Sequence, residues 1–178
     1  EGCRAVGFPA VMKVVSPEII HKSEVGGVIV GIRSDEEARE AFRRLEAVGR
    51  GRGLRGVVVY PQLPKGQEVL LGCSRDPQFG PVVVLGMGGI YTEILKDIAL
   101  RVAPVTKEEA QAMIRELKAY PILSGARGQT PSDLDALAEV VVRFSRLPFL
   151  YPEIKEIDLN PVFLYQKGLL AADVRVIR

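Results

Sequence analysis

The segment 13–28 reads KVVSPEIIHKSEVGGV, and the rest of the chain is organised around it. An apolar run that ends at Val15 is followed by a polar loop with the only histidine of the sequence, a glycine pair and a second apolar run. Two strands joined by such a loop suit a phosphate-binding hairpin, in which Lys13 extends from the first strand and Lys22, Ser23 and loop amides face the anion. An ordinary surface hairpin with a salt-bridged lysine is the alternative, and spacing alone favours it because short motifs match falsely.

Length and composition are those of a soluble globular protein with one domain or two small lobes. The chain has 178 residues, 47% of them hydrophobic and 26% charged, and its net charge of +2 gives no strong attraction to nucleic acid or membrane. No apolar run approaches the ~20 residues that a membrane-spanning helix needs, and the first residues show no signal peptide. Cys3 and Cys73 lie far apart, which argues against a zinc site or a disulfide framework, so we expect a cytoplasmic protein. Because the chain begins abruptly before a buried-looking strand, we also expect a fragment of a longer protein.

Three segments carry the signals of capped, amphipathic helices. Ser34 and Thr106 each precede a glutamate by three residues, which is the pattern of a capping box. Thr130, followed by Pro131, is expected to cap the third helix. Periodicity predicts core-facing residues at Ala38, Ala41, Phe42, Leu45 and Val48 in the first helix, Ala110, Met113, Ile114 and Leu117 in the second, and Leu134, Leu137, Ala138, Val141 and Val142 in the third.

Short apolar segments between these helices predict further buried strands, at 57–60, 67–73 and 82–85. The segment 61–66 is expected to be a hinge between lobes, because its two prolines cannot continue a strand. The glycine-rich stretch 86–89 suits either a loop that lets backbone approach a phosphate or a tight turn. The arginine–glycine stretch 49–56 is short and lacks aromatic residues, so a solvated loop is favoured over an RNA-binding segment.

The segment 156–160, EIDLN, alternates polar and apolar residues. Because strand side chains alternate between faces, Asp158 and Asn160 are expected on the same face. A hairpin turn at 166–168 returns the chain, and pairing back from it places Asp173 opposite Asn160, within about one residue of register. Oxygen ligands on adjacent strands suit Mg²⁺, which leaves its other positions to phosphates and water. A solvent-facing polar strand is the alternative.

Four motifs can now be read together, IHKSEVGGV at 20–28, RDPQFGP at 75–81, GMGGIYTE at 86–93 and EIDLNP at 156–161. They closely resemble the ATP-grasp β subunit, or β domain, of ADP-forming acetyl-CoA synthetases, a group related to the β subunit of succinyl-CoA synthetase. The resemblance covers essentially the whole chain, and four motifs in order with matching gaps are specific although each alone is weak. It implies an α+β ATP-grasp fold, in which two lobes with mixed or antiparallel sheets and helices clasp a nucleotide.

The resemblance also implies an enzyme, an acid–thiol ligase that interconverts acid, CoA and ATP with acyl-CoA, ADP and phosphate through phosphohistidine. In the family, phosphate passes first to a histidine of the partner subunit and then toward the nucleotide. Mg²⁺ and ATP or ADP are the implied cofactors. The implied partner is a CoA-binding subunit or fused domain, in a full enzyme that is an oligomer. An inert, regulatory domain of a protein lysine acetyltransferase is the alternative, and retention of His21, Asp158, Asn160 and Asp173 argues against it.

Individual residues take their expected roles from the same resemblance. His21 stands where relatives carry a histidine that relays phosphate, and Asp158 stands where they carry an acidic residue near the phosphohistidine. Imidazole suits a relay because it is nucleophilic when neutral near pH 7 and leaves well when protonated. The nucleotide-binding residues are Lys13, His21, Lys22, Ser23 and Glu68, and the metal ligands are Asn160 and Asp173.

The lobes of the fold follow from the resemblance as well. We expect a partial first lobe with the phosphate-binding hairpin at 1–60, the hinge at 61–66, and a second lobe with the magnesium-binding hairpin at 67–178. About a quarter of an ATP-grasp domain is expected to be missing ahead of the first lobe. Relatives usually carry Gln-Glu where this chain has Tyr60 and Pro61, a departure that bears on nucleotide affinity or base preference, and Gln62 is the candidate substitute.

Overall fold

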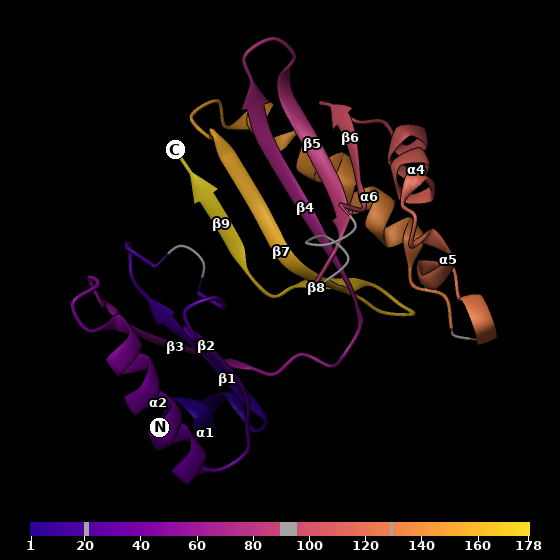
Figure 1. Ribbon diagram of the computed structural model, residues 1–178. Helices are drawn as coiled ribbons and strands as arrows, with labels where there is room; N and C mark the ends of the chain where they lie inside the picture. The colour runs from indigo at the N-terminus through magenta and orange to yellow at the C-terminus, as the bar shows by residue number, and fades with distance from the viewer. Residues whose placement is uncertain (20–21, 90–95, 129) are drawn as a thin grey trace. The chain divides into compact units, whose positions relative to one another are not determined.

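The computed structural model describes residues 1–19, 22–89, 96–128 and 130–178 (Figure 1). The chain divides into two compact units, Glu1–Pro64 and Lys65–Arg178, each with a hydrophobic core of its own. The role of 61–66 as a hinge stays a prediction. None of the helices in the described ranges combines the length and hydrophobicity needed to span a bilayer.

The first unit is a small antiparallel sheet with helical cover. It contains, in chain order, α1 (Gly2–Val6), β1 (Ala10–Val15), β2 (Val28–Ile32), α2 (Asp35–Gly49) and β3 (Gly56–Pro61). The strand order is β2-β1-β3, so the predicted hairpin of β1 and β2 is present. Side chains alternate along β1, and Ala10, Met12 and Val14 are buried in a core shared with Leu45 of α2. The opposite face of β1 is therefore left for other contacts.

Helix α2 begins at the predicted cap but differs from the prediction on one face. The Ser34 hydroxyl accepts a hydrogen bond from the N–H of Glu37 at 3.2 Å, whereas the Glu37 carboxylate accepts from the N–H of Arg33 at 2.7 Å instead of Ser34. The capping box is thus only half formed. The prediction for Phe42 is wrong, because its side chain is 46% exposed. Packing toward β1 uses a narrower stripe that includes Ala41 and Leu45.

Strand β3 extends one residue beyond the predicted range at each end, and its residues are half-buried or exposed rather than buried. Pro61 pairs with Ala10 of β1 and belongs to the strand. Strand β3 lies at the edge of the sheet and has a neighbouring strand on one side only. Proline, which has no N–H to donate, is tolerated in such an edge strand. Gln62 follows directly, and its side-chain oxygen accepts from the N–H of Gly31 in β2 at 2.7 Å. The Gln62 side chain thus holds the irregular part of β2, where the pairing with β1 shifts register.

The second unit is a larger antiparallel sheet with helices on one face. Its elements are β4 (Gln67–Asp76), β5 (Gly80–Met87), β6 (Ile98–Val102), α4 (Lys107–Glu116), α5 (Tyr120–Leu123), the 3₁₀ helix η1 (Ala126–Gly128), α6 (Leu134–Ser145), α7 (Leu147–Leu150), β7 (Glu156–Leu164), β8 (Leu169–Ala171) and β9 (Val174–Ile177). The strand order is β6-β5-β4-β7-β8, and β9 also pairs with β7. Every pairing is antiparallel, and the predicted α+β class is confirmed.

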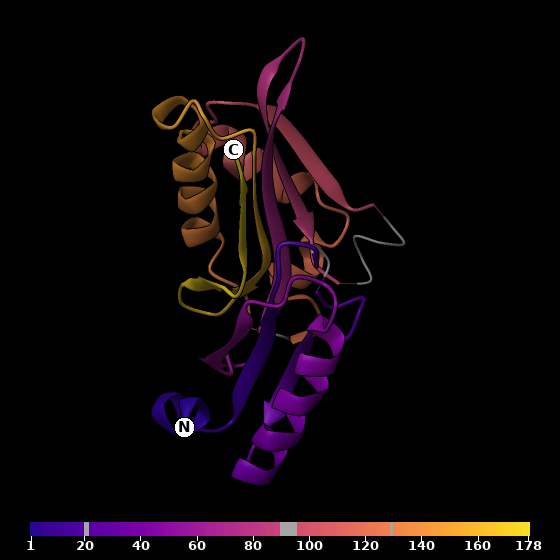
Figure 2. The same cartoon turned by 90° about the vertical axis from the view of Figure 1, so that its left-hand side faces the viewer.

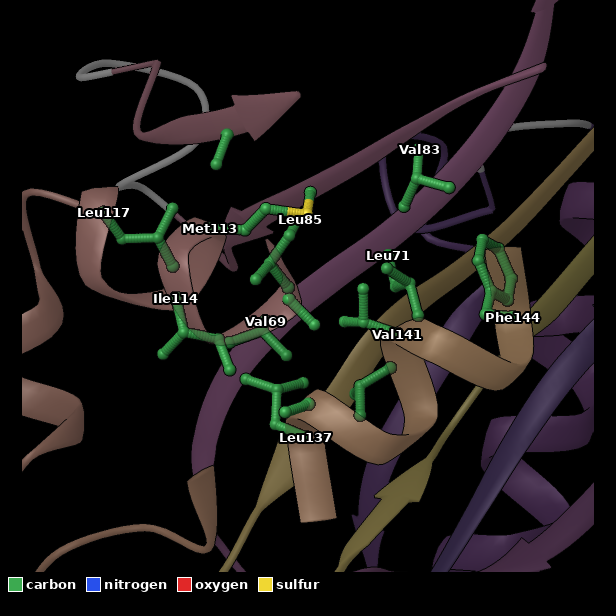
Figure 3. Packing of buried hydrophobic residues seen from close by; sticks show 14 of the residues in the cluster. Val69, Leu71, Val83, Leu85, Met113, Ile114, Leu117, Leu137, Val141 and Phe144 are labelled. Carbon is green, nitrogen blue, oxygen red and sulfur yellow. The ribbon is translucent and has the colours of Figure 1, made fainter. Parts of the chain in front are cut away.

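The core of the second unit lies between this sheet and the helices α4 and α6 (Figure 2, Figure 3). Figure 3 shows Leu71 and Leu85 of neighbouring strands facing Met113 and Ile114 of α4 and Val141 of α6. Each of these five side chains is at most 2% exposed. Removing one of them from water stabilises the fold by roughly 1.5–3 kcal/mol. The helices therefore hold the sheet rigid from one side, and its other face carries the polar positions of β7.

The predictions for α4 and α6 differ in accuracy. Thr106 forms the complete capping box of α4, since its hydroxyl accepts from the N–H of Glu109 and its own N–H donates to the Glu109 carboxylate. The prediction that Thr130 caps α6 is wrong, because α6 begins at Leu134 and Asp133 is its N-cap. Tertiary hydrogen bonds explain the later start. The N–H of Ser132 donates to the carbonyl of Leu123, and the N–H of Asp133 to that of Tyr165, which keeps this stretch out of the helix.

The arginine–glycine stretch, 49–56, is mostly exposed to solvent and is also hydrogen-bonded to the rest of the first unit. The Ser16 hydroxyl donates to the carbonyl of Arg52, and the N–H of Arg55 donates to the carbonyl of Val15 at 2.8 Å. Arg50, Arg52 and Arg55 are all exposed. The loop is thus anchored by its backbone to the end of β1, and its guanidinium groups face solvent.

Candidate functional site

Lys13 lies on the face of the first sheet that points away from the core. It pairs with Val28 on β2 and with Val58 on β3, and like its neighbours along that face it is half-buried. The Lys13 ammonium is 5.6 Å from the centroid of the Tyr60 ring, within the range of a cation–π contact. This arrangement presents one positive charge on a largely apolar surface, which suits an anionic ligand with a flat apolar part.

The loop ahead of β2 closes tightly onto β1. The N–H of Gly27 donates to the carbonyl of Lys22 at 2.6 Å, and Gly26 has a φ of +70°. A Cβ on Gly27 would lie 2.7 Å from the Val14 side chain, so only glycine permits this approach. Lys22 is half-buried and Ser23 is exposed. The loop thus turns tightly at its glycine pair, and its role in phosphate binding stays a prediction.

The histidine assigned to phosphate relay is outside the described residues. His21 falls in the gap at 20–21, and the later part of the glycine-rich motif falls in the gap at 90–95. Their roles therefore stay predictions based on the sequence.

Glu68 is exposed near the start of β4 and lies beside the first part of the glycine-rich motif. The N–H of Gly88 donates to the carbonyl of Glu68 at 2.6 Å. A Cβ on Gly88 would come within 2.6 Å of the Glu68 Cβ and within 3.0 Å of its backbone. Glycine is thus required at position 88 because the chain passes closely over Glu68. The prediction for 86–89, which offered a phosphate loop or a tight turn, did not include this contact.

We expect Gly88→Ala to lower the free energy of unfolding by about 1–3 kcal/mol, because the new methyl group overlaps Glu68. The same displacement should weaken nucleotide binding if Glu68 contacts the nucleotide. Gly72→Ala is the matched control in the same strand pair, since the nearest atom to its Cβ is 3.8 Å away. Its stability should change by no more than about 0.5 kcal/mol. Urea denaturation measures the free energy of unfolding of both variants, and equal losses would contradict the close packing of Gly88 on Glu68.

Asn160 and Asp173 are brought together across the final hairpin. The backbone N–H of Asn160 donates to the carbonyl of Asp173 at 3.3 Å, which continues the pairing of Leu159 with Val174. The turn at Gly168 has the positive φ, +74°, that the prediction required. The two residues therefore occupy the opposed positions predicted from the sequence, although their role as metal ligands is untested.

The chemistry of this pair fits Mg²⁺. Asn160 offers an amide oxygen and Asp173 a carboxylate, and both are the hard oxygen donors that Mg²⁺ prefers. Across the described ranges, no group of three or more His, Cys, Asp or Glu side chains is arranged to hold a metal. Two protein oxygens would leave the other coordination positions of Mg²⁺ to phosphates and water, an arrangement common for this ion.

Asp158 lies in β7 between Gly72 of β4 and Arg175 of β9. Its side chain is half-buried, and its Oδ1 lies 3.8 Å from where a Cβ of Gly72 would stand. Arg175 forms an ion pair with Glu156, which lies two residues before Asp158 in β7. The missing side chain at Gly72 therefore leaves room beside the Asp158 carboxylate.

The sequence reasoning missed Asp133, which connects this hairpin to helix α6. Its Oδ1 accepts from the N–H of Ala136 at 3.0 Å, and its Oδ2 accepts from the N–H of Gly168 at 2.8 Å. The pKa of the Asp133 carboxyl is held below its usual value. The hydrogen bond from Gly168 has the largest effect, followed by that from Ala136, and the nearby Lys167 ammonium adds to it. Asp is a preferred N-cap residue, so its place just before the periodic helix was a usable signal.

Comparison with known proteins supplies the family. The model of the ATP-grasp domain family matches residues 1–177. The chain is 55% identical over 176 residues to the beta subunit of ADP-forming acetate–CoA ligase I from Pyrococcus furiosus, covering 97% of this chain and 76% of the relative. It is 44% identical over 177 residues to ADP-forming acetate–CoA ligase I from Archaeoglobus fulgidus, covering 97% of this chain and 26% of that longer protein.

Solved structures give the same result. The dinucleotide-forming acetyl-coenzyme A synthetase 1 of Candidatus Korarchaeum cryptofilum, in complex with coenzyme A, Ca-AMPCP and HgCl⁺, superimposes with a TM-score of 0.93 at 43% identity. That match covers 98% of this chain and 78% of the other. A structure of the same enzyme with coenzyme A and Mg-AMPPCP has a TM-score of 0.84 at 43% identity, again over 98% and 78% of the two chains. The chain therefore belongs to the ATP-grasp family, together with the beta subunits of ADP-forming acetate–CoA ligases.

Proposed function

We propose that this chain is the nucleotide-binding, ATP-grasp part of an ADP-forming acid–CoA ligase. The enzyme interconverts acid, CoA and ATP with acyl-CoA, ADP and phosphate. The observation that carries the proposal is the 55% identity to a beta subunit of such a ligase over nearly the whole chain. The relatives reported above are ligases, and they lend no support to a regulatory domain of a lysine acetyltransferase.

In this proposal, different residues bind different parts of the magnesium nucleotide. Lys13 provides positive charge for phosphate oxygens, and the turn at 22–27 provides backbone N–H groups, Lys22 and Ser23. Glu68, which packs against Gly88, is a further nucleotide-binding residue in this proposal. Asn160 and Asp173 would hold Mg²⁺, which when bound neutralises charge on the phosphates.

His21 carries the phosphoryl group between the partner's phosphohistidine and ADP. A neutral imidazole nitrogen of His21 attacks phosphorus while the nitrogen–phosphorus bond to the partner's imidazole breaks. In the next step an ADP phosphate oxygen attacks the same phosphorus and His21 leaves, so ATP forms and the histidine is restored. Asp158 accepts the N–H of a phosphohistidine imidazole and so fixes its orientation.

The CoA site belongs to a partner subunit or a fused domain. The Pyrococcus furiosus relative is named as a beta subunit, whereas the Archaeoglobus fulgidus relative is a longer chain of which the match covers 26%. We assign the protein to the cytoplasm, a compartment that keeps thiols reduced. Cys3 and Cys73 are both buried and free, and burial raises the pKa of each thiol, which keeps them protonated and inert.

Calorimetric titration of the complete enzyme with ADP, with and without Mg²⁺, tests the proposal. Tight binding that requires Mg²⁺ is expected, because the charged phosphates need both Lys13 and the cation. Titration with AMP is the control, since AMP lacks the phosphates beyond the first. Equal affinity for AMP and ADP, or ADP binding that ignores Mg²⁺, would overturn the assignment.

A further inference from the structure

Asp133, the N-cap residue of helix α6, bonds to the turn of the hairpin that carries Asn160 and Asp173. The backbone N–H of Asp133 donates to the carbonyl of Tyr165 at 2.7 Å, on the incoming side of the turn. On the outgoing side, the N–H of Gly168 donates to Asp133 Oδ2 at 2.8 Å. Asp133 therefore holds both arms of the turn, while its Oδ1 caps α6 through Ala136.

We infer that Asp133 is a positioning residue that fixes the two oxygen ligands Asn160 and Asp173 by clamping the turn of their hairpin. The inference rests on the metal assignment of the proposed function. The side-chain hydrogen bonds of Asp133 are to the backbone of Ala136 and Gly168. Its action passes through the backbone of the hairpin.

A series of backbone hydrogen bonds joins the clamp to the ligand pair. From the turn, β8 pairs with the end of β7 through Leu169 and Leu164 and then Ala171 and Val162. Strand β8 ends at Ala171 and β9 begins at Val174, and two single bonds connect the intervening residues to β7. The N–H of Ala172 donates to the carbonyl of Pro161 at 2.8 Å, and the N–H of Asn160 donates to the carbonyl of Asp173 at 3.3 Å. We therefore expect a shift of the turn to change the separation of the two ligands.

The ladder needs an external anchor because β8 is weak by itself. It has three residues and lies at the end of the sheet order, so it pairs on one side only. Leu169 packs against the core, but Leu170 is 49% exposed and Ala171 is exposed, so one side chain of three supplies the apolar burial of the strand. Short edge strands with few buried contacts open locally at low cost. A charged acceptor on the Gly168 amide supplies the missing restraint, since hydrogen bonds to ionised groups are the stronger ones.

Asp133→Asn in the complete enzyme is the test. Asparagine still caps a helix, but it cannot accept from both amides, because one side-chain position is now an NH₂ donor. We expect Mg²⁺-dependent ADP affinity to fall by about tenfold, the lower end of what loss of an outer-shell partner costs a metal site. ADP affinity without Mg²⁺ should be unchanged, and amides 168–172 should exchange hydrogen faster.

Thr106→Ala is the matched control, because it removes a side-chain cap of the same kind from α4 and makes no bond to the hairpin. It should leave both the Mg²⁺ dependence and the exchange rates at 168–172 unchanged. Asp133→Ser, which keeps the cap but is too short to reach Gly168, gives the same readings if Asp133→Asn fails to fold. Asp173→Ala, tested alongside, separates the two ideas. If it removes Mg²⁺ dependence while both Asp133 variants bind like the wild type, the clamp is wrong and the metal assignment stands. If Asp173→Ala has no effect, the metal assignment fails and the inference fails with it.

Discussion

Replacing Asp173 with alanine is expected to remove nearly all Mg²⁺-dependent binding of ADP and to leave the fold intact. Asp173 lies opposite Asn160 and is the charged residue of the proposed metal site, so its loss would leave that site a single neutral protein ligand. We expect an affinity loss of about a hundredfold in Mg²⁺, at the upper end for perturbed metal sites. Calorimetric titration with ADP at saturating Mg²⁺ measures it, and circular dichroism checks the fold.

Glu153→Ala is the control for charge alone, since it removes an exposed carboxylate from the same unit that lies outside the strands of the hairpin. Its ADP affinity should match that of the wild type at every Mg²⁺ concentration. Unchanged affinity in Asp173→Ala would show that the metal is held elsewhere. A similar loss in both variants would show that net charge, rather than coordination, sets the affinity.

Replacing His21 with asparagine is expected to reduce turnover by about a thousandfold or more, because the relay then has no nucleophile. Asparagine keeps a polar side chain of comparable size, so nucleotide affinity should change little. Steady-state rates and ADP titration of the same preparation separate these two effects. Lys22→Ala is the neighbouring control, and its loss should be mainly in nucleotide affinity because it provides charge rather than chemistry.

The intermediate gives an independent reading of the same prediction. The complete enzyme should take up label from γ-phosphate-labelled ATP in a form that survives base and is lost in acid, as a phosphoramidate does. A phosphoserine at neighbouring Ser23 would survive acid instead. If His21→Asn keeps full turnover, and label is found on the partner histidine alone, His21 has a structural or nucleotide-contacting role and the relay is wrong.

Where the sequence predicted the structure well, local rules were sufficient. The opposition of Asn160 and Asp173 follows from strand alternation and from counting back from a turn that needs a glycine. The capping box at Thr106 likewise depends on residues three apart, and the structure forms both of its hydrogen bonds. Such features involve few residues that are close in the chain, so tertiary contacts rarely overrule them.

The sequence predictions failed where contacts between residues far apart in the chain determine the structure. The start of α6 moved from Thr130 to Asp133 because backbone groups of that stretch bond to Leu123 and Tyr165, far away in sequence. The tight passage of Gly88 over Glu68 comes from the pairing of β4 with β5, which no spacing rule reveals. The clamp at Asp133 has the same origin, because its second partner is a turn that lies after β7.

Release of CoA from acetyl-CoA is the most direct test of the central claim that this chain is the nucleotide-binding part of an ADP-forming ligase. The assay combines the complete protein with its CoA-binding partner and follows the free thiol. We predict release that requires ADP, phosphate and Mg²⁺ together, with ATP formed in equal amount and no release by this chain without the partner. Release by the isolated chain, or release by the assembled enzyme that does not depend on ADP, would contradict it.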